Sequence, residues 1–381
     1  MFYANELNAL TKSGILRERR IFSACDSLKD FASNDYLGLA NRIDSLKKAY
    51  KLAKNPKYFA PRASMLVNGY SKLHKKLETR ISTLNGFESC ILVGSGFLAN
   101  IALIESLVRK GDKIFIDEEY HASGILASKL VQSVEFFRHN DSADLENKIR
   151  TFLGEGSESN KSNKNAAKDS RIIIAIEGIY SMSGDIAKKD FALIALKYNA
   201  ILIVDEAHSS GTLGRNLLGY FDFYRIKIAP NFIKLGTFSK AYGSYGAYIC
   251  CSNHIYAYLQ TRAKPIIYST ALSAFDSALA LANLNFIHKN RSKFHAKIQK
   301  IQKIIQKNLK IKVDSQIFSI QFQSQNEMLK TFRFLKKRGF FVGAIRKPSV
   351  KIPQLRIILS TKHDKKDIAK LCKLLKNHLK N

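Results

Sequence analysis

Apolar residues in the middle of the chain fall into short runs that are separated by stretches with helical periodicity. Runs typical of buried strands occur at 90–93, 113–117, 133–137, 171–176, 201–204, 232–236 and 247–251. Helical patterns lie between most of these runs, from about residue 72 onward. The alternation predicts an α/β fold in which helices cover both faces of a mainly parallel central sheet.

The two ends of the chain have a different pattern. A helix is expected over about 3–20, followed by an extended piece through 31–38. Beyond about residue 270, a lysine-rich helical stretch leads to shorter strands at 316–322, 340–345 and 355–359, and to a final helix from Lys365. We therefore expect an N-terminal segment (1–45), a large α/β domain (46–268) and a smaller α+β C-terminal domain (269–381). The polar stretch 154–170 is expected to be a loop without a catalytic role.

Composition narrows the class of protein. The 381 residues suffice for two domains. No apolar run approaches the roughly 20 residues of a membrane span, and residues 1–20 lack the apolar core of a signal peptide. The five cysteines are scattered and lack metal-ligand spacing. We therefore expect a cytoplasmic protein with reduced thiols, no bound metal and no membrane contact.

The chain is strongly basic, with 62 Lys and Arg against 31 Asp and Glu. Such a surface attracts polyanions, including nucleic acid, an acidic carrier protein or coenzyme A. The basic residues are spread through the whole chain, however, and no RNA-binding signature or basic arm is present. A generally basic protein without a nucleic-acid partner is the favoured interpretation, and a nucleic-acid-binding protein is the alternative.

One lysine stands in a setting suited to covalent chemistry. Lys240 lies between small residues just after the apolar run 232–236, which fixes its backbone and leaves room for a flat ring. A second apolar run ends in Asp205, and His208 follows three residues later. A lysine that can react with an aldehyde, together with an acid that can pair with a ring nitrogen, predicts a pyridoxal 5′-phosphate (PLP) site.

Three further candidates follow predicted strands. Gly96 lies in a glycine-rich turn that opens a helix and can hold a phosphate, His121 follows 113–117, and Ser181 follows 171–176. Ligands of open α/β sheets bind at the carboxyl ends of strands, so these residues, Asp205 and Lys240 are expected to share one site. The alternative for the Gly94–Ala99 turn is a dinucleotide-binding oxidoreductase, with Asp117 on the ribose. That alternative leaves Lys240 and Asp205 without a role.

The motifs, in this order, resemble the α-oxoamine synthases, a branch of the fold-type I PLP-dependent transferases (aspartate aminotransferase-like). The resemblance extends from about Leu16 to His363. The similar segments are 33–39, Gly69-Tyr70 with 74–78, 95–97, 177–185, 204–208 and 239–241. Two departures are Pro61–Asn68, where the family has a glycine-rich stretch, and Gln354, where an arginine is common.

For the cofactor, the resemblance implies that Lys240 forms the Schiff base, Asp205 pairs with the ring nitrogen and His121 stacks on the ring. These three are the expected catalytic residues. Ser181 and His208 are expected to bond the ring oxygen. The amides of Gly96 and Phe97, together with Thr237, are expected to hold the phosphate.

For the substrates, the resemblance implies that Arg356 grips the amino-acid carboxylate through two parallel bonds. Arg17 and Ser349 match positions that contact the acyl substrate, and Asn34 and His121 are the remaining expected substrate contacts. A homodimer is also implied, in which residues near Ser269 and Thr270 reach the phosphate bound by the partner.

The implied reaction is a decarboxylative condensation of an amino acid with an acyl thioester. Ser239 and Ala241 beside the lysine, with Gly243 and Gly246, resemble the branch that condenses L-alanine with a pimeloyl thioester in biotin synthesis. The thioester carrier, coenzyme A or acyl carrier protein, stays open. The alternative is a branch that uses glycine and an acyl-CoA, in which Gly more often precedes the lysine.

Overall fold

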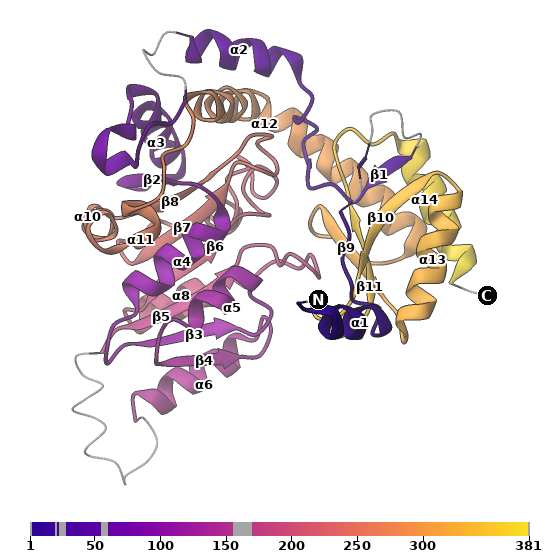
Figure 1. Cartoon of the computed structure of the whole chain (residues 1–381), viewed down its shortest axis with the longest axis horizontal. Helices are drawn as coiled ribbons and strands as arrows, with labels where there is room; N and C mark the ends of the chain where they lie inside the picture. Colours follow the sequence, from indigo (N-terminus) through magenta and orange to yellow (C-terminus); the bar gives the residue numbers. More distant parts are fainter. Residues whose placement is uncertain (1, 20, 23–27, 55–59, 155–169, 380–381) are drawn as a thin grey trace. The chain divides into compact units, whose positions relative to one another are not determined.

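The computed structural model describes residues 2–19, 21–22, 28–54, 60–154 and 170–379. The chain divides into two compact units, which are described separately. The larger unit comprises Asp35–Ser181 and Asp185–Ile298, and the smaller unit comprises Met1–Asn34, Met182–Gly184 and Gln299–Asn381 (Figure 1). The predicted stretch 154–170 lies, except for its two end residues, outside the described residues.

A seven-stranded sheet forms the centre of the larger unit, in the order β2-β8-β7-β6-β5-β3-β4 (Figure 1). Its strands are β2 (Ser89–Val93), β3 (Lys113–Asp117), β4 (Val134–Phe137), β5 (Ile172–Glu177), β6 (Ile201–Asp205), β7 (Phe232–Thr237) and β8 (Ala247–Cys251). Pairing is parallel from β7 to β4, whereas β8 is antiparallel to both of its neighbours, β2 and β7. The predicted mainly parallel sheet is confirmed.

Both faces of this sheet are covered. Alternate strand residues such as Ile116, Ile203 and Ile249 join one apolar cluster with helix α4 (Gly96–Leu107). The intervening residues, such as Phe115 and Leu202, are fully buried as well. The central parallel strands are continuous apolar runs in the sequence because both faces of the sheet are buried against helices.

The other described helices of the larger unit precede, connect or follow these strands along the chain. They are α2 (Ile43–Ala53), α3 (Lys72–Asn85), α5 (Ala122–Ser128), α6 (Ser142–Phe152), α8 (Asp190–Lys197), α9 (Tyr220–Tyr224), α10 (Asn253–Arg262), α11 (Lys264–Ile267) and most of α12 (Ala274–Leu309), with a π-helical turn η1 (Met65–Gly69). Helix α3 illustrates how the sequence sets a helix start. Ser71 accepts the amide of His74, and the His74 imidazole accepts the amide of Ser71.

The smaller unit is built on a four-stranded sheet in the order β1-β10-β11-β9. Its elements are β1 (Lys29–Phe31), β9 (Ile317–Gln321), β10 (Phe340–Ile345), β11 (Gln354–Ile358), α1 (Ala4–Lys12), α13 (Gln325–Lys337) and α14 (Lys365–His378). The predicted strands and the final helix from Lys365 are confirmed. Phe31 of β1 joins the core with Phe340 and Leu371, so part of the N-terminal segment completes the C-terminal sheet.

Two expectations differ from the structure. The N-terminal helix ends at Lys12, well before residue 20, because Gly14 adopts a left-handed conformation with φ of 68°. The expected domain boundaries at 45/46 and 268/269 also differ from the compact units, which divide at Asn34 and Ile298. Residues 269–298, which include the first part of α12, belong to the larger unit, and α12 is kinked at Asn290.

Candidate active site

The candidate residues of the larger unit follow strands that run in one direction. Strand β2 is antiparallel to β8, which is antiparallel to β7, so β2 points the same way as β7, β6, β5 and β3. Gly96, His121, Ser181, Asp205 and Lys240 therefore lie at one edge of the sheet, where the strands end. This is the edge at which open α/β sheets bind ligands.

Asp205, the last residue of β6, is buried and held in place by hydrogen bonds. The side-chain amide of Asn100 donates to its Oδ2 at 2.8 Å, and the backbone amide of Ala207 donates to its Oδ1 at 2.9 Å. Asn100 is itself held by the hydroxyl of Tyr120, which donates to Asn100 Oδ1 at 2.7 Å. The arrangement fixes a carboxylate that can pair with a cationic ring nitrogen.

Lys240 follows β7 and is joined to His208. The Nζ atom of Lys240 lies 2.6 Å from Nε2 of His208, and the hydroxyl of Tyr36 lies 2.5 Å from Nδ1 of the same ring. The imidazole therefore bridges the lysine amine and a buried phenol. Space beside Lys240 depends on glycine, because a Cβ on Gly211 would lie 2.5 Å from the Cβ of Ala241.

His121 precedes helix α5, and Ser123 connects it by two hydrogen bonds to Asn100, the side chain that donates to Asp205. Its Nδ1 lies 2.7 Å from Ser123 Oγ, to which Asn100 donates at 3.0 Å. Burial lowers the pKa of the His121 imidazole; Asp205 opposes this effect and Lys240 adds to it. A neutral, flat ring at this position suits stacking on an aromatic ligand.

The start of α4 and the end of β7 form a cradle suited to an anion. A Cβ on Gly96 would lie 3.9 Å from the Cβ of Thr237, so the two segments are close neighbours. Thr237 Oγ1 lies 2.8 Å from Ser239 Oγ, and Ser95 Oγ accepts the amide of Leu98 at 3.2 Å. The first turn of a helix presents backbone amides and the positive end of the helix dipole, which favours phosphate.

Ser181 lies in the turn after β5, and its backbone amide donates to Glu177 Oε2 at 2.9 Å. Glu177 is buried beside Asp205, its register partner on β6. Burial first, and then the charge of Asp205, raise the pKa of Glu177 well above its usual range. Burial therefore favours the neutral form of Glu177.

The other expected substrate contacts belong to the smaller unit, where the structure brings them together in two pairs. Arg356 in β11 is 8% exposed, and both of its terminal nitrogens donate to Asn34 Oδ1 at 3.2 Å. Arg17 Nη2 donates to Ser349 Oγ at 3.0 Å. Gln354, where the family often has an arginine, is buried and donates to the carbonyl of Met182 at 3.0 Å.

The sequence reasoning missed several residues of this arrangement: Tyr36, Asn100, Tyr120, Ser123 and Glu177. Asn100 gave a usable signal, since it is a polar residue in the apolar first half of α4, one turn after Gly96. Glu177 also ends an apolar strand next to the one that ends in Asp205. A buried polar group requires partners, so such positions indicate a hydrogen-bonded site.

The donor set of the larger unit fits a phosphorylated heteroaromatic aldehyde. It offers a lysine amine, a buried carboxylate for a ring nitrogen, a neutral imidazole and a helix start for phosphate. The dinucleotide alternative fits less well because its proposed ribose ligand, Asp117, is fully buried. Its carboxylate instead accepts hydrogen bonds from the Tyr180 hydroxyl at 2.6 Å and the Asn140 amide at 2.7 Å.

A family model described as aminotransferase class I and II matches residues 27–375 of the chain. The chain therefore belongs to this family of PLP-dependent enzymes, as the α-oxoamine synthase resemblance implied, and the expected cofactor is confirmed. The dinucleotide-binding oxidoreductase is ruled out by this membership.

Two curated relatives are similar to this chain over nearly its whole length. The 8-amino-7-oxononanoate synthase of Helicobacter pylori (strain ATCC 700392 / 26695) is 44% identical over 380 residues, covering 99% of this chain and 98% of that protein. A putative 8-amino-7-oxononanoate synthase of Aquifex aeolicus (strain VF5) is 33% identical, covering 98% of both.

Two solved structures share the fold. The 8-amino-7-oxononanoate synthase of Francisella tularensis superposes with a TM-score of 0.74 at 25% identity, covering 93% of this chain and 98% of that one. A serine palmitoyltransferase of Sphingomonas wittichii superposes with a TM-score of 0.85 at 21% identity, covering 99% and 98%. The predicted fold-type I transferase architecture is confirmed.

Proposed function

We propose that this protein is a PLP-dependent acyltransferase that makes 8-amino-7-oxononanoate, carbon dioxide and a free thiol from L-alanine and a pimeloyl thioester. This is a reaction of biotin biosynthesis. The observation that carries the proposal is the full-length likeness, at 44% identity, to a protein of that name. The arrangement of Lys240, His208 and Asp205 at one sheet edge supports it, because this chemistry needs an amine and a fixed acid beside the cofactor.

In this proposal, the larger unit holds the cofactor. Asp205 pairs with the ring nitrogen, His121 stacks on the ring, and Ser181 and His208 bond the ring oxygen. The phosphate is held by the amides of Gly96 and Phe97 and by Thr237. When bound, PLP supplies an electron-withdrawing ring that makes the α-proton of the amino acid removable.

Lys240 has two roles in this proposal. Its Nζ amine would hold the cofactor aldehyde, and the same amine would act as the general base for the α-proton of the amino acid. The 2.6 Å contact with His208 Nε2 holds that amine at a defined position. A bond from the α-carbon to the thioester carbonyl carbon would form as the C–S bond breaks and the thiolate leaves to be protonated. The alanine carboxylate would then be lost as carbon dioxide, and a proton would return to the α-carbon.

Arg356 is proposed to bind the alanine carboxylate. Its side chain is buried and its terminal nitrogens share a single amide oxygen, that of Asn34. A carboxylate offers two oxygens to the same guanidinium fork, which gives a stronger, charge-assisted pair. Arg17 and Ser349 are proposed to contact the acyl substrate, and their mutual hydrogen bond keeps both side chains in place.

We also propose a homodimer, with Ser269 and Thr270 reaching the phosphate bound by the partner. Thr270 forms a bridge with Ser64, so these two segments lie side by side. They carry exposed apolar side chains that a partner would cover, notably Val67 at 76% and Tyr268 at 79% exposure. Light scattering should give twice the mass of one chain, and full activity of a monomer would contradict the proposal.

A cytoplasmic location is proposed as well. Four cysteines, Cys90, Cys250, Cys251 and Cys372, are buried as free thiols, which suits a reducing compartment. Cys25 lies outside the described residues. Among the helices that the structure describes, none combines the length and apolarity needed to cross a membrane.

The decisive experiment is an assay of the purified, PLP-loaded protein with L-alanine, glycine and L-serine. Each amino acid is offered pimeloyl-CoA, pimeloyl-acyl carrier protein and acetyl-CoA, and the products are identified by mass spectrometry. The proposal expects 8-amino-7-oxononanoate from L-alanine and a pimeloyl donor. Preferential condensation of glycine with a short acyl-CoA would instead establish the alternative branch of the family.

A further inference from the structure

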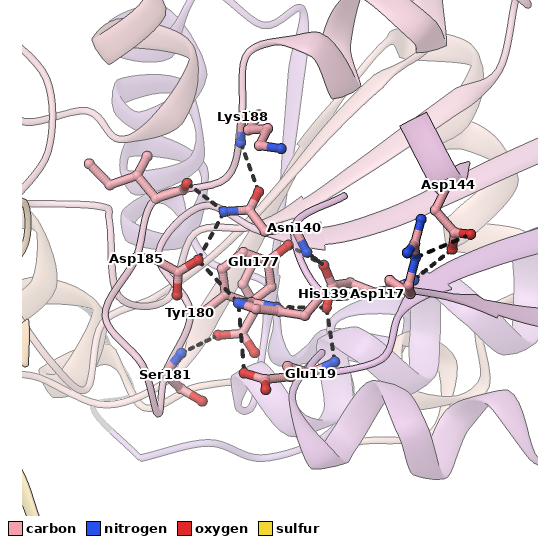
Figure 2. Close-up of polar contacts among 12 residues, drawn as sticks. Asp117, Glu119, His139, Asn140, Asp144, Glu177, Tyr180, Ser181, Asp185 and Lys188 are labelled. Atoms are coloured by element: carbon pink, nitrogen blue, oxygen red, sulfur yellow. Dashed lines mark hydrogen bonds and ion pairs between the residues drawn. The ribbon is translucent and has the colours of Figure 1, made fainter. Parts of the chain in front are cut away.

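A second polar cluster, outside the residues assigned above, lies at the same edge of the large sheet (Figure 2). At its centre is His139, two residues after β4. Its Nδ1 lies 3.1 Å from Asp117 Oδ1, and its Nε2 lies 3.1 Å from Asp185 Oδ2. The proposed reaction uses none of these three residues.

The geometry requires a doubly protonated ring. A neutral imidazole has one donor and one acceptor nitrogen, but here each nitrogen faces a carboxylate. Glu119 adds a third carboxylate, 3.7 Å from Nε2, and the ring packs edge-on against Tyr180. Burial alone lowers the pKa of His139, but the hydrogen bonds to Asp117 and Asp185 outweigh it and raise the pKa to about 10.

Asp117 attaches this histidine to the sheet. Its fully buried carboxylate also accepts the Glu119 amide at 2.9 Å, the Asn140 amide and the Tyr180 hydroxyl. Because β3 is paired on both sides, this carboxylate has a fixed position. The position of the His139 ring is therefore fixed by the sheet, with its Nε2 directed at Asp185.

Asp185 is the last residue of the turn that carries Ser181. The Tyr180 amide donates to the Asp185 carbonyl at 3.0 Å and so closes the turn. At the Asp185 end, Asn140 Nδ2 donates to Asp185 Oδ2 at 2.9 Å and to the Ile186 carbonyl at 3.0 Å. At the other end, the Ser181 amide is held by Glu177, as Figure 2 shows.

We propose that His139 is a positioning residue, which as a cation between Asp117 and Asp185 fixes the Tyr180–Asp185 turn and thereby the position of Ser181 at the cofactor. The inference rests on the proposed function in one respect, that Ser181 bonds the ring oxygen of PLP. Asp185 is the partner that can be substituted with less disturbance of the core, since its side chain is 39% exposed whereas Asp117 is buried.

The test compares His139→Gln, Asp185→Asn and the double variant with the wild type. Glutamine can donate to one carboxylate but cannot bridge two. His254→Gln, the same change at an exposed histidine on α10, is the matched control. The readouts are the dissociation constant of PLP and the position of its absorbance band in the bound state, together with nitrogen chemical shifts of the His139 ring in the PLP-free protein at pH 8.

Each single variant should weaken PLP binding about ten- to a hundredfold, the effect of one hydrogen bond to a charged group, and shift the absorbance band. The PLP dissociation constant of the double variant should exceed that of the more weakly binding single variant by no more than about twofold. Both changes remove the same contact, so their effects should not add. The ring should be doubly protonated at pH 8. The His254→Gln protein should match the wild type.

Three results would overturn the proposal: a band position and PLP affinity in His139→Gln equal to the control, additive effects in the double variant, or a neutral ring at pH 8. If His139→Gln fails to fold, Asp185→Asn carries the same comparison. A lower melting temperature with an unchanged band would mean a structural role and also reject the proposal. Failure of the proposed function appears differently, as a wild-type protein that lacks the PLP band or the condensation product.

Discussion

The amine of Lys240 and the imidazole of His208 are in direct contact, with 2.6 Å between Nζ and Nε2. Lys240 comes from the turn after β7, and His208 comes from the segment after β6, the neighbouring strand. The sequence separates them by 32 positions, but parallel pairing of β6 and β7 places their ends side by side. The contact fixes where the amine meets a ligand.

Replacement of Lys240 by alanine should abolish the absorbance of covalently bound cofactor and nearly all turnover. The fold should persist, because Lys240 lies in a turn at the sheet edge and outside the core clusters. Absorbance after borohydride treatment and circular dichroism measure the two effects. Replacement of the exposed Lys264 by alanine is the control, and turnover near the wild-type level in Lys240→Ala would remove this lysine from the mechanism.

The Asp205→Asn variant should still bind PLP but lose most α-proton removal. An amide cannot keep the ring nitrogen protonated as the carboxylate does, so the ring withdraws electrons less strongly. Exchange of the alanine α-proton with deuterated solvent, followed by NMR, measures this step without the acyl donor. Exchange at the wild-type rate would show that Asp205 is only a buried acid at the end of a strand.

Asn100→Ala tests a residue that holds the Asp205 carboxylate through a hydrogen bond. The change removes one of the two hydrogen bonds described for the Asp205 carboxylate and also the Tyr120 hydroxyl's bond to Asn100, which should cost about 2–3 kcal/mol of unfolding free energy. Chemical denaturation of the PLP-free protein gives this value. Asn85→Ala, at a partly buried asparagine near the end of α3, removes a side-chain bond to its own helix and should cost less. An equal loss in the two variants would argue against a special role for Asn100.

Arg356→Lys should weaken alanine binding by roughly ten- to a hundredfold, because an ammonium cannot form two parallel bonds with a carboxylate. The absorbance of bound PLP should not change, since the proposed role concerns the substrate alone. Spectral titration with L-alanine measures both. Normal alanine affinity, or loss of PLP, would reject the assignment of Arg356 to the carboxylate.

Stability should depend on pH through His139. The folded-state pKa of about 10 lies above the ordinary 6.5, so the cation stabilises the fold fully below pH 6.5. That contribution should be lost progressively as the pH rises from 6.5 to 10. The difference in unfolding free energy between wild type and His139→Gln should shrink over this range. A constant difference would contradict the raised pKa.

Much of the fold was determined by the sequence itself. Each predicted strand of the large sheet was found within one residue or so of its expected ends, because buried parallel strands are continuous apolar runs. The glycine-rich turn at Gly94–Ala99 correctly marked the start of α4. Lys240 and Asp205 could be proposed from the sequence because each is a chemically distinctive residue at or shortly after the end of an apolar strand.

Only the tertiary structure decided the strand order, the reversed direction of β8 and the entry of residues 29–31 into the sheet of the smaller unit. It also decided which polar residues support the site. Asn100 lies in α4, whereas Tyr120 and Ser123 follow β3, 20 and 23 positions later, and nothing local indicates that one carboxylate and one imidazole meet through them. The same holds for His139, whose two carboxylate partners lie 22 and 46 positions away. Apolar periodicity reports burial one segment at a time, whereas a hydrogen-bond partner depends on which segments the fold brings together.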